Sequence, residues 1–533
     1  MQANTESYDV VVVGYGAAGA AAALEAARGG ASVLIVERFH GGGTTAISGG
    51  VFYAGGGTKY QQDAGVEDSP DNMYNYLHAE LGDDVSETLL RDFCNESIEQ
   101  LTWLESLGVP FDSKVCPFKT SMPTEGYSLY YSGSENVRPF SDVASPAQRG
   151  HRAVGKGRSG DVVFSYLDKA VQAAGIKVVP YARVTDLIFE GDRVVGVRYS
   201  QVARYQDRYT ALATKLTAAA GKLNLYAPFL GRGIAKVMAA QERTLTRPVS
   251  VRARRGVILA AGGYAYNRQL VEQHAPRFKQ GRANATMGDD GSGIALARSA
   301  GASVSHLDKV SGWRLMAPPD AMQKGVLVAA DGDRVCCEQL YGARVGMHVA
   351  HRANGKAWLI LDQAIVAEMR EQIPNQTMWW QRASLEAVLA PTGHVSADSI
   401  AELGRKCGID SFELNRTIAD YNDRIAAGTE DEMLKADSYR QPIANGPFIA
   451  LDFGIKNQRM PFVLVSLGGV DVDEHSRQAV RNDGTPIEGL YAVGRTAVGV
   501  CTGQYVSGLS LSDCIFTGRR AGRHVVASAA AVA

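Results

Sequence analysis

Two short apolar runs near the N-terminus flank a stretch rich in alanine. Val10–Val13 leads into a glycine turn, alanines dominate the next residues up to Arg28, and a second apolar run ends at Glu37. A short apolar run is typical of a buried strand, and small residues after a glycine turn are typical of a helix that lies close to it. The pattern therefore predicts a strand–helix–strand unit over residues 9–37.

The glycine turn has the spacing of a dinucleotide-binding motif. It reads Gly14-x-Gly16-x-x-Gly19, with Ala18 before the last glycine. These glycines allow a tight turn, close approach of a pyrophosphate and close contact between helix and strand, while the helix N-terminus favours phosphate charge. Glu37, 23 residues after Gly14, is placed to accept hydrogen bonds from a ribose, and its charge disfavours NADP. A glycine-rich turn without a ligand is the alternative.

The periodicity of apolar positions changes further along the chain. It predicts helices over 69–108 and 160–174 and strands over 176–180, 182–190, 193–200 and 255–261. From about residue 303 to 451 the pattern becomes mixed α+β, with helix over 384–427, and an apolar strand follows at 490–493. This change indicates a second domain inserted into the first.

Length and composition are those of a soluble protein with more than one domain. A chain of 533 residues exceeds the size at which one core keeps growing, and 45% apolar with 21% charged residues is ordinary for a globular protein. The formal charge of -1 argues against a nucleic-acid partner. The seven cysteines form no C-x-x-C pair, and neither a leader nor a run of about 18 apolar residues is present. We expect a cytoplasmic protein with reduced cysteines.

An insert over 201–247 separates two of the predicted strands. Between 204 and 247 it has eight Lys or Arg residues against two acids, a local excess of +6, with apolar residues among them. That mixture suits a peripheral contact with an anionic membrane on the cytoplasmic side. A helical hairpin on the protein body and an oligomer contact are the alternatives.

A second glycine-rich stretch, residues 40–57, follows the strand–helix–strand unit. Glycine this dense indicates that a ligand approaches the backbone, and in a flavoprotein that ligand is the pyrophosphate and ring of FAD. A flexible loop is the alternative. A third glycine-rich region, over 489–522, opens the terminal helix, whose N-terminus would stabilise charge on the flavin pyrimidine. Beyond the first motif and Glu37, the predicted FAD contacts are Arg38, Thr44, Thr45, Ser48, Gly49, Gly50, Val184, Ala261, Gly262, Gly263, Asp290, Gly494, Arg495, Ser510 and Leu511.

Five motifs together resemble those of the FAD-dependent fumarate reductase and 3-ketosteroid dehydrogenase superfamily. They are VVVGYGAAGAAAALEAA, TTAISGG, VILAAGGY, GDDGSGIALARSAGA and the terminal GLYAVGR…GLSLSDCIFTGRRAG. The resemblance covers nearly the whole chain apart from the insert. It implies an α/β, Rossmann-like FAD-binding domain of the glutathione-reductase type, over 1–303 and 452–533, interrupted by an α+β capping catalytic domain over 304–451.

The last glycine loop distinguishes branches of that superfamily. Tyr505-Val-Ser507 is similar to the branch that oxidises the 4,5 bond of 5α-3-ketosteroids, in which a Tyr-x-Ser pair carries the chemistry. The 1,2-dehydrogenases have a Tyr-Pro-Gly element here, and proline is absent from this loop. Arg495 stands where the reductase branch commonly has an acid. The resemblance therefore favours a 3-ketosteroid 4,5-dehydrogenase.

A segment of the capping domain is ambiguous between the branches. Tyr341 matches a segment that supplies an active-site tyrosine to the steroid enzymes. Glu338 and Arg344 lie beside it, and related reductases use an acid and an arginine there for proton relay. A reductase of a small unsaturated acid, a 3-ketosteroid 1,2-dehydrogenase and a non-catalytic flavoprotein remain the alternatives.

Desaturation beside a ketone removes a proton from the α carbon and a hydride from the β carbon. We predict that Tyr505 and Ser507 take and relay the proton, with Ser507 assisting a phenol that is otherwise a poor base, and that Tyr341 contributes from the cap. The backbone N–H near Gly508 would hold the ketone oxygen. In the alternative interpretation, Tyr505 and Ser507 only pack a turn.

The substrate pocket is expected to be apolar, because a steroid is. Tyr131 and Trp313 are the predicted substrate contacts, taken from a wider set of candidate wall residues. That set is Tyr127, Tyr130, Tyr131, Trp313, Leu315 and Met316. No second dinucleotide motif follows, so the electron acceptor is expected to be a quinone, another carrier or oxygen. No metal site is expected.

Overall fold

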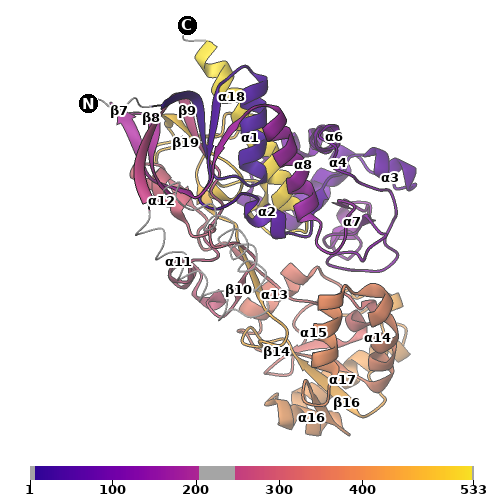
Figure 1. Cartoon of the computed structure of the whole chain (residues 1–533). Coiled ribbons are helices and arrows are strands. Elements are labelled where there is room, and N and C mark those ends of the chain that lie inside the picture. The colour runs from indigo at the N-terminus through magenta and orange to yellow at the C-terminus, as the bar shows by residue number, and fades with distance from the viewer. Residues whose placement is uncertain (1–5, 203–245, 531–533) are drawn as a thin grey trace.

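An eight-stranded sheet forms the centre of the larger lobe in the computed structural model, which describes residues 6–202 and 246–530 (Figure 1). The strand order is β19-β20-β9-β1-β2-β6, and the antiparallel pair β7–β8 extends from β9. Strand β1 is parallel to both β2 and β9. The strands are β1 (Glu6–Val13), β2 (Val33–Val36), β6 (Lys177–Val179), β7 (Ala182–Glu190), β8 (Arg193–Val202), β9 (Thr246–Leu259), β19 (Gln478–Val480) and β20 (Pro486–Ala492).

The first and last helices of the larger lobe lie side by side. Helix α1 (Ala17–Arg28) follows β1, and α18 (Leu509–Ala530) is the yellow helix next to it in Figure 1. Small residues make this approach close, because a Cβ on Gly522 would lie 3.0 Å from the Cβ of Glu25 and still closer to the Ala22 carbonyl. Two segments from opposite ends of the chain thus form one layer on the sheet.

A small antiparallel sheet and several helices flank that layer. Strand β5 lies between β3 and β4, so that Tyr130 of β4 faces Gly150 of β5. These elements are β3 (Val51–Tyr53), β4 (Leu129–Tyr130), β5 (Gly150–Arg152), α2 (Gly43–Ile47), α3 (Lys59–Asp63), α4 (Pro70–Leu81), α5 (Glu87–Asn95), α6 (Ser97–Ser106), α7 (Phe140–Val143) and α8 (Gly160–Ala173).

The smaller lobe, orange in Figure 1, is built on a four-stranded antiparallel sheet with order β13-β14-β16-β15. Helices α14 to α17 belong to the same lobe. The elements are β13 (Val326–Ala329), β14 (Ala357–Leu361), β15 (Val395–Ala397), β16 (Phe448–Asp452), α13 (Gly342–His351), α14 (Gln363–Gln376), α15 (Trp379–Leu389), α16 (Ile400–Cys407) and α17 (Ser411–Ala426).

Short elements join the two lobes. They are β10 (Arg282–Ala283), β11 (Val304–Ser305), β12 (Val310–Trp313), β17 (Val463–Ser466), β18 (Gly469–Val470), α11 (Arg268–His274) and α12 (Ser292–Ser299). Turns of 3-10 helix occur at Gly82–Asp84, Pro276–Phe278, Asp320–Lys324, Asp437–Tyr439, Gly494–Thr496 and Val500–Thr502.

The predicted α/β fold is confirmed, with parallel strands at the centre of the larger sheet. The domain boundaries at 303/304 and 451/452 stay predictions. Nearly all of the 201–247 insert, and so the membrane contact expected of it, lies outside the described residues. In the part of the chain that the structure describes, no helix is long and apolar enough to cross a membrane.

Candidate active site

Three parallel strands of the central sheet end at one edge, and a glycine follows each within three residues. Val13 of β1 is level with Leu259 of β9, which is level with Ala492 of β20. The chain therefore brings Gly14, Gly262 and Gly494 together, although the sequence spreads them over nearly its whole length. Ligands of parallel α/β sheets bind at this carboxyl edge.

The turn after β1 leaves room only where a ligand needs it. Gly14 has φ +105, and a side chain there would collide with the Ala260 carbonyl, while one on Gly19 would collide with the Gly14 carbonyl. A Cβ on Gly16, in contrast, would have no neighbour closer than the Thr45 hydroxyl at 3.5 Å. The same hydroxyl accepts the N–H of Ala17 at 3.1 Å, at the start of α1. Gly16 thus presents open backbone at a helix N-terminus, which fits a pyrophosphate.

The Glu37 carboxylate is held by backbone groups rather than by a cation. Its two oxygens accept the N–H groups of Tyr15 and Phe39, each at 2.7 Å. Burial raises the pKa of Glu37, and these N–H groups oppose that effect. Each carboxylate oxygen has a further lone pair, so a ribose hydroxyl can still donate to it.

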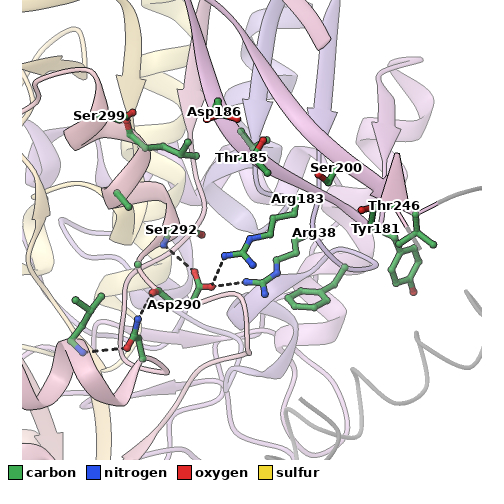
Figure 2. A pocket seen from close by; sticks show the side chains of 18 residues that line it. Arg38, Tyr181, Arg183, Thr185, Asp186, Ser200, Thr246, Asp290, Ser292 and Ser299 are labelled. Carbon is green, nitrogen blue, oxygen red and sulfur yellow. Dashed lines mark hydrogen bonds and ion pairs between the residues drawn. The ribbon is translucent and has the colours of Figure 1, made fainter. Parts of the chain in front are cut away.

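Three of the predicted FAD contacts line a cavity of about 760 Å³ beside β7 and α12 (Figure 2). They are Arg38, Val184 and Asp290. The Arg38 guanidinium donates to Asp290 at 2.7 Å, and Arg183 approaches the same carboxylate at 3.7 Å. The tyrosines and serine of the proposed chemistry are not among its lining residues, so this cavity is distinct from the reacting end of the site.

A buried ion pair ties the loops at the sheet edge together. Arg495 lies 2.7 Å from Asp289 and also donates to the Thr44 hydroxyl at 3.1 Å. Asp289 in turn accepts the N–H of Gly263 at 2.7 Å. Burial alone would lower the pKa of Arg495, but Asp289 raises it above its usual value. Sequence reasoning chose Asp290 and missed Asp289, because two adjacent acids in one turn look alike.

The remaining predicted FAD contacts lie on the loops and helix starts around this edge. Ser48 donates to the Thr45 carbonyl at 2.8 Å, and a Cβ on Gly49 would lie 2.9 Å from the Met122 sulfur. Ser510 and Leu511 lie in the first turn of α18. The open backbone at Gly16, the Glu37 carboxylate with its free hydrogen-bonding capacity, and the converging glycine loops fit FAD. The predicted FAD contacts not yet placed, Ala18, Gly50 and Ala261, lie on the same loops and helix starts.

Four hydroxyl groups gather where the last glycine loop meets β4 and the smaller lobe. Tyr130 and Ser507 share a hydrogen bond of 3.0 Å between their hydroxyl oxygens. The Tyr130 hydroxyl also donates to the Ser121 carbonyl at 3.3 Å. Tyr341, the residue before α13, belongs to the same group, because Ser507, Tyr505 and Tyr130 all affect the pKa of its phenol. The structure thus brings Tyr341, Tyr505 and Ser507 together, and adds Tyr130.

Burial controls the acidity of these phenols. It raises the pKa of Tyr341 and Tyr130 well above the usual range, and hydrogen bonding to Ser507 opposes the rise in both. Burial and the neighbouring Cys501 raise the pKa of Tyr505 to about 12, although Arg495 acts in the opposite direction. The three phenols are therefore neutral at physiological pH, and none is a ready base by itself.

Gly508 fixes the loop that carries Tyr505 and Ser507. Its φ is +90, and a Cβ there would lie 2.9 Å from the backbone nitrogen of Tyr53 and from Val51 on β3. Only glycine avoids both the backbone strain and this contact. The loop can therefore lie flat against β3, next to the tyrosine of β4.

The two predicted substrate contacts have different surroundings. Trp313 ends β12, and its indole nitrogen would lie 2.7 Å from a Cβ on Gly342, the residue after Tyr341. That indole N–H is buried and has no hydrogen-bond partner within the described residues. Tyr131 is partly buried, and burial together with Glu135 raises its pKa. Both stay predictions.

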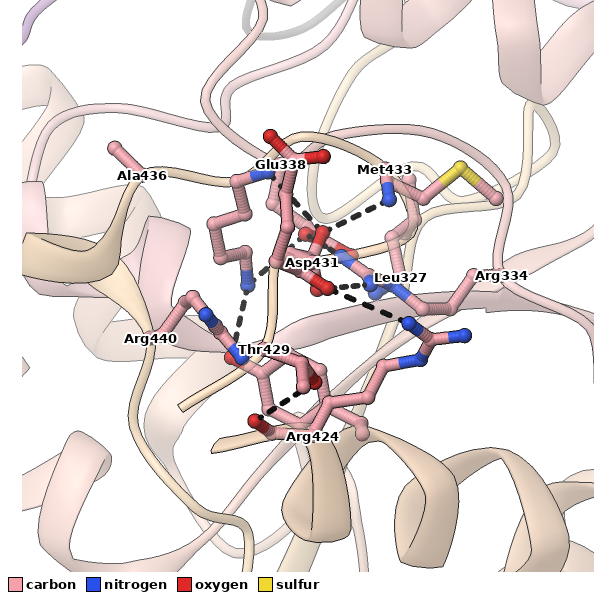
Figure 3. Close-up of polar contacts among 12 residues, drawn as sticks. Leu327, Arg334, Glu338, Arg424, Thr429, Asp431, Met433, Ala436 and Arg440 are labelled. Carbon is pink, nitrogen blue, oxygen red and sulfur yellow. Dashed lines mark hydrogen bonds and ion pairs between the residues drawn. The ribbon is translucent and has the colours of Figure 1, made fainter. Parts of the chain in front are cut away.

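Glu338, the acid that made the cap segment ambiguous, belongs to a buried ion cluster of the smaller lobe (Figure 3). It accepts from Arg334 at 2.8 Å and lies 2.9 Å from Lys435, while Asp431 takes the other side of Arg334 at 2.7 Å. Burial alone would raise the pKa of Glu338, but the two cations hold it below its usual value. Arg344 pairs instead with Glu80 of α4 at 2.8 Å. Acid and arginine therefore do not form one relay.

Across residues 6–202 and 246–530, no group of three or more His, Cys, Asp or Glu side chains could hold a metal ion. The polar chemistry described for this part of the chain rests on phenols, a serine and backbone groups.

Residues 9–511 match the family described as FAD binding domain, so the chain belongs to this family. It is 34% identical over 429 residues to the 3-oxo-5-alpha-steroid 4-dehydrogenase of Comamonas testosteroni, a match that covers 79% of this chain and 80% of that protein. It is 27% identical over 592 residues to a 3-oxosteroid 1-dehydrogenase of Mycolicibacterium smegmatis, covering 99% and 98% of the two chains.

A solved structure resembles the whole molecule. The crystal structure of 3-ketosteroid-delta4-(5alpha)-dehydrogenase from Rhodococcus jostii RHA1, in complex with 4-androstene-3,17-dione, matches with a TM-score of 0.79 at 32% identity. The match covers 98% of this chain and 97% of that chain. The predicted family and its FAD cofactor are confirmed.

Proposed function

We propose that this chain is an FAD-dependent dehydrogenase that introduces the 4,5 double bond into 5α-3-ketosteroids. The observation that carries the proposal is the cluster of Tyr130, Tyr341, Tyr505 and Ser507, which three distant segments assemble beside the flavin edge of the sheet. The match over about four-fifths of a 3-oxo-5-alpha-steroid 4-dehydrogenase supports it.

The reaction removes a proton from C4 and a hydride from C5 of the steroid. Bound FAD supplies the hydride acceptor, its N5 atom. The chain must therefore take the proton and stabilise the negative charge that develops on the ketone oxygen. Tyrosines and a serine suit both tasks, because each hydroxyl can donate and accept.

Ser507 is the centre of the proton relay in this proposal. Its hydroxyl bonds to Tyr130 at 3.0 Å and influences the pKa of the Tyr341 phenol, so a proton taken up at Ser507 can pass to a phenol while that phenol releases its own proton to solvent. Sequence reasoning expected Ser507 to assist Tyr505. The hydrogen bond to Tyr130 supports a different division, with Ser507, Tyr130 and Tyr341 as the relay.

Tyr505 is better suited to donate a hydrogen bond to the ketone oxygen than to accept the proton from C4. With a pKa of about 12, it keeps its proton at neutral pH and can donate it in a hydrogen bond. A fixed donor aimed at a developing oxyanion stabilises the transition state. The backbone N–H near Gly508 is the second donor in this proposal, and Tyr131 and Trp313 line the apolar pocket.

A reductase of small unsaturated acids is the second candidate function, and the site supports it less well than a steroid dehydrogenase. Glu338 is already paired with two cations, and Arg344 is paired with Glu80. A dicarboxylate would need unpaired cations near the flavin, whereas Arg495 is neutralised by Asp289.

The proposal is tested by anaerobic titration of the purified yellow protein. A 5α-3-ketosteroid should bleach the flavin and yield the conjugated 4-ene-3-ketone, whereas the corresponding 4-ene-3-ketosteroid should not bleach it. Bleaching by the 4-ene-3-ketosteroid with formation of a 1,4-diene would favour a 1,2-dehydrogenase. Failure of every steroid to bleach, with reoxidation of chemically reduced protein by fumarate, would favour the reductase.

We also propose that reduced FAD passes its electrons to a quinone or another carrier, since the sequence has one dinucleotide motif only. A cytoplasmic location with peripheral membrane contact through residues 201–247 is consistent with such an acceptor. Flotation with anionic liposomes tests it, and equal flotation of the intact protein and a version lacking the insert would contradict it.

A further inference from the structure

The segment Tyr130–Glu135 contacts every other element of the proposed relay. Its first residue bonds to the Ser507 hydroxyl at 3.0 Å. The carbonyl of Ser132 accepts the backbone N–H of Ser507 at 3.3 Å. The side chain of Ser134 accepts the backbone N–H of Tyr341 at 3.0 Å. One short segment therefore holds the last glycine loop on one side and the start of α13 on the other.

Ser134 uses all of its polar groups in this link. Its N–H donates to the Tyr76 hydroxyl at 2.8 Å, its carbonyl accepts from Val137 at 2.9 Å, and its hydroxyl faces Tyr341. The residue is fully buried. Tyr341 is the N-cap residue of α13 and its own side chain caps nothing, so the contact with Ser134 fixes the main chain from which the phenol extends.

The turn around Ser134 cannot shift easily. The Glu135 carboxylate accepts the N–H of Gly133 at 2.8 Å and closes the turn. A Cβ on Gly133 would collide with the Tyr76 hydroxyl and lie 3.0 Å from Val506, between the two residues of the Tyr-x-Ser pair. The turn is thus set directly against the loop that carries Ser507.

We propose that Ser134 is a positioning residue, whose hydroxyl fixes the main chain of Tyr341 next to the loop that carries Ser507. This inference rests on the proposed function and extends it. Ser134 is fully buried. It acts through Tyr341, because displacement of the Tyr341 main chain would move its phenol away from the Ser507 hydroxyl.

The chain contains a matched control two residues away. Ser132 is as fully buried as Ser134, but its hydroxyl has no hydrogen-bond partner within the described residues. Ser134→Ala and Ser132→Ala therefore make the same chemical change in the same segment, and only the first removes the acceptor of the Tyr341 N–H.

The experiment measures anaerobic flavin bleaching over a range of 5α-3-ketosteroid concentrations. Ser134→Ala should lower the limiting rate by roughly 10- to 100-fold, because small misplacement of a reacting group is costly, with little change in steroid affinity. Ser132→Ala should stay close to the wild-type rate. Equal rates in the two variants would overturn the inference.

A double-variant cycle separates positioning from a general loss of structure. In a Tyr341→Phe background, Ser134→Ala should lower the bleaching rate little further, since the phenol it positions is gone, yet it should lower the melting temperature as much as in the wild type. Rate losses that multiply in the double variant would contradict action through Tyr341. If Ser134→Ala does not fold, Ser134→Cys, whose thiol is a weak acceptor, should give the same pattern.

Failure of the two proposals is distinguishable. A wild-type protein that no 5α-3-ketosteroid bleaches counts against the proposed function. A wild-type protein that is bleached, with Ser134→Ala and Ser132→Ala indistinguishable from each other, counts against the role of Ser134 alone.

Discussion

The hydroxyl of Tyr130 lies 3.0 Å from the hydroxyl of Ser507, although 377 positions separate the two residues in the chain. Both groups are buried. Strand β4 supplies one and the loop before α18 supplies the other, so the fold rather than a local motif creates this contact. It joins Tyr130, one of the candidate wall residues, to Ser507 of the proposed proton relay.

Tyr130→Phe removes the phenol from this relay without changing the ring. We expect the limiting rate of steroid-dependent bleaching to fall by roughly 10²- to 10⁴-fold, the range of general acid–base contributions, with the flavin spectrum unchanged. Stopped-flow absorbance measures the rate. The control is Tyr60→Phe, which removes a hydroxyl that donates to Glu105 elsewhere in the larger lobe. A Tyr130 variant as fast as this control would exclude Tyr130 from the relay.

Tyr505→Phe should separate the relay from the oxyanion donor. Removal of one such donor is expected to lower the limiting rate by roughly 10²- to 10³-fold. Because Tyr505 acts as a neutral donor here, the pH dependence of the remaining rate should match that of the wild type. Loss of an ionisation from the pH–rate profile would instead identify Tyr505 as the base.

Glu338→Gln tests the buried ion cluster of the smaller lobe. The change leaves Arg334 and Lys435 without a shared carboxylate, so the free energy of unfolding should fall by about 3–5 kcal/mol. Denaturant unfolding measures it. Below its melting temperature the variant should keep most of the steroid bleaching rate. If the folded variant binds steroid but its flavin is no longer bleached, Glu338 takes part in proton transfer, as in the reductase interpretation.

Glu135→Gln should change the pH dependence of stability. Burial raises the pKa of Glu135, partly opposed by Arg149 and Lys119, so the folded protein binds this proton more tightly than the unfolded chain does. Stability of the wild type therefore falls as pH rises from the unfolded pKa of about 4.3 toward the higher folded value. Glutamine cannot ionise, so the melting temperature of the variant relative to wild type should rise over that window. A difference independent of pH would contradict this prediction.

The sheet and its cofactor edge were largely predictable, because buried strands need apolar runs and tight turns need glycine, and both features are visible in a short stretch of sequence. The strand predicted over 182–190 coincides with β7, and the helix predicted over 160–174 ends within one residue of α8. The strand predicted over 255–261 covers the buried end of a longer one and passes its end by two residues, since β9 runs from Thr246 to Leu259 and alternates between exposed and buried positions over 250–254.

The site was less predictable where it depends on contacts between distant segments. Tyr127, Tyr130 and Tyr131 are alike in sequence, but in the structure it is Tyr130, paired with Gly150 on β5, that bonds to Ser507. Ser134 carries no motif, because its role comes from a backbone N–H that lies 207 positions away. Sequence periodicity contains no record of such partners.

The contact between α1 and α18 has a consequence for biosynthesis. Helix α1 leaves the ribosome long before Leu509–Ala530 is made, so the flavin-binding lobe cannot complete its core until α18 has been synthesised. During that interval the face of α1 that packs against α18 is uncovered. Nascent chains of this protein should therefore depend on chaperones until α18 emerges.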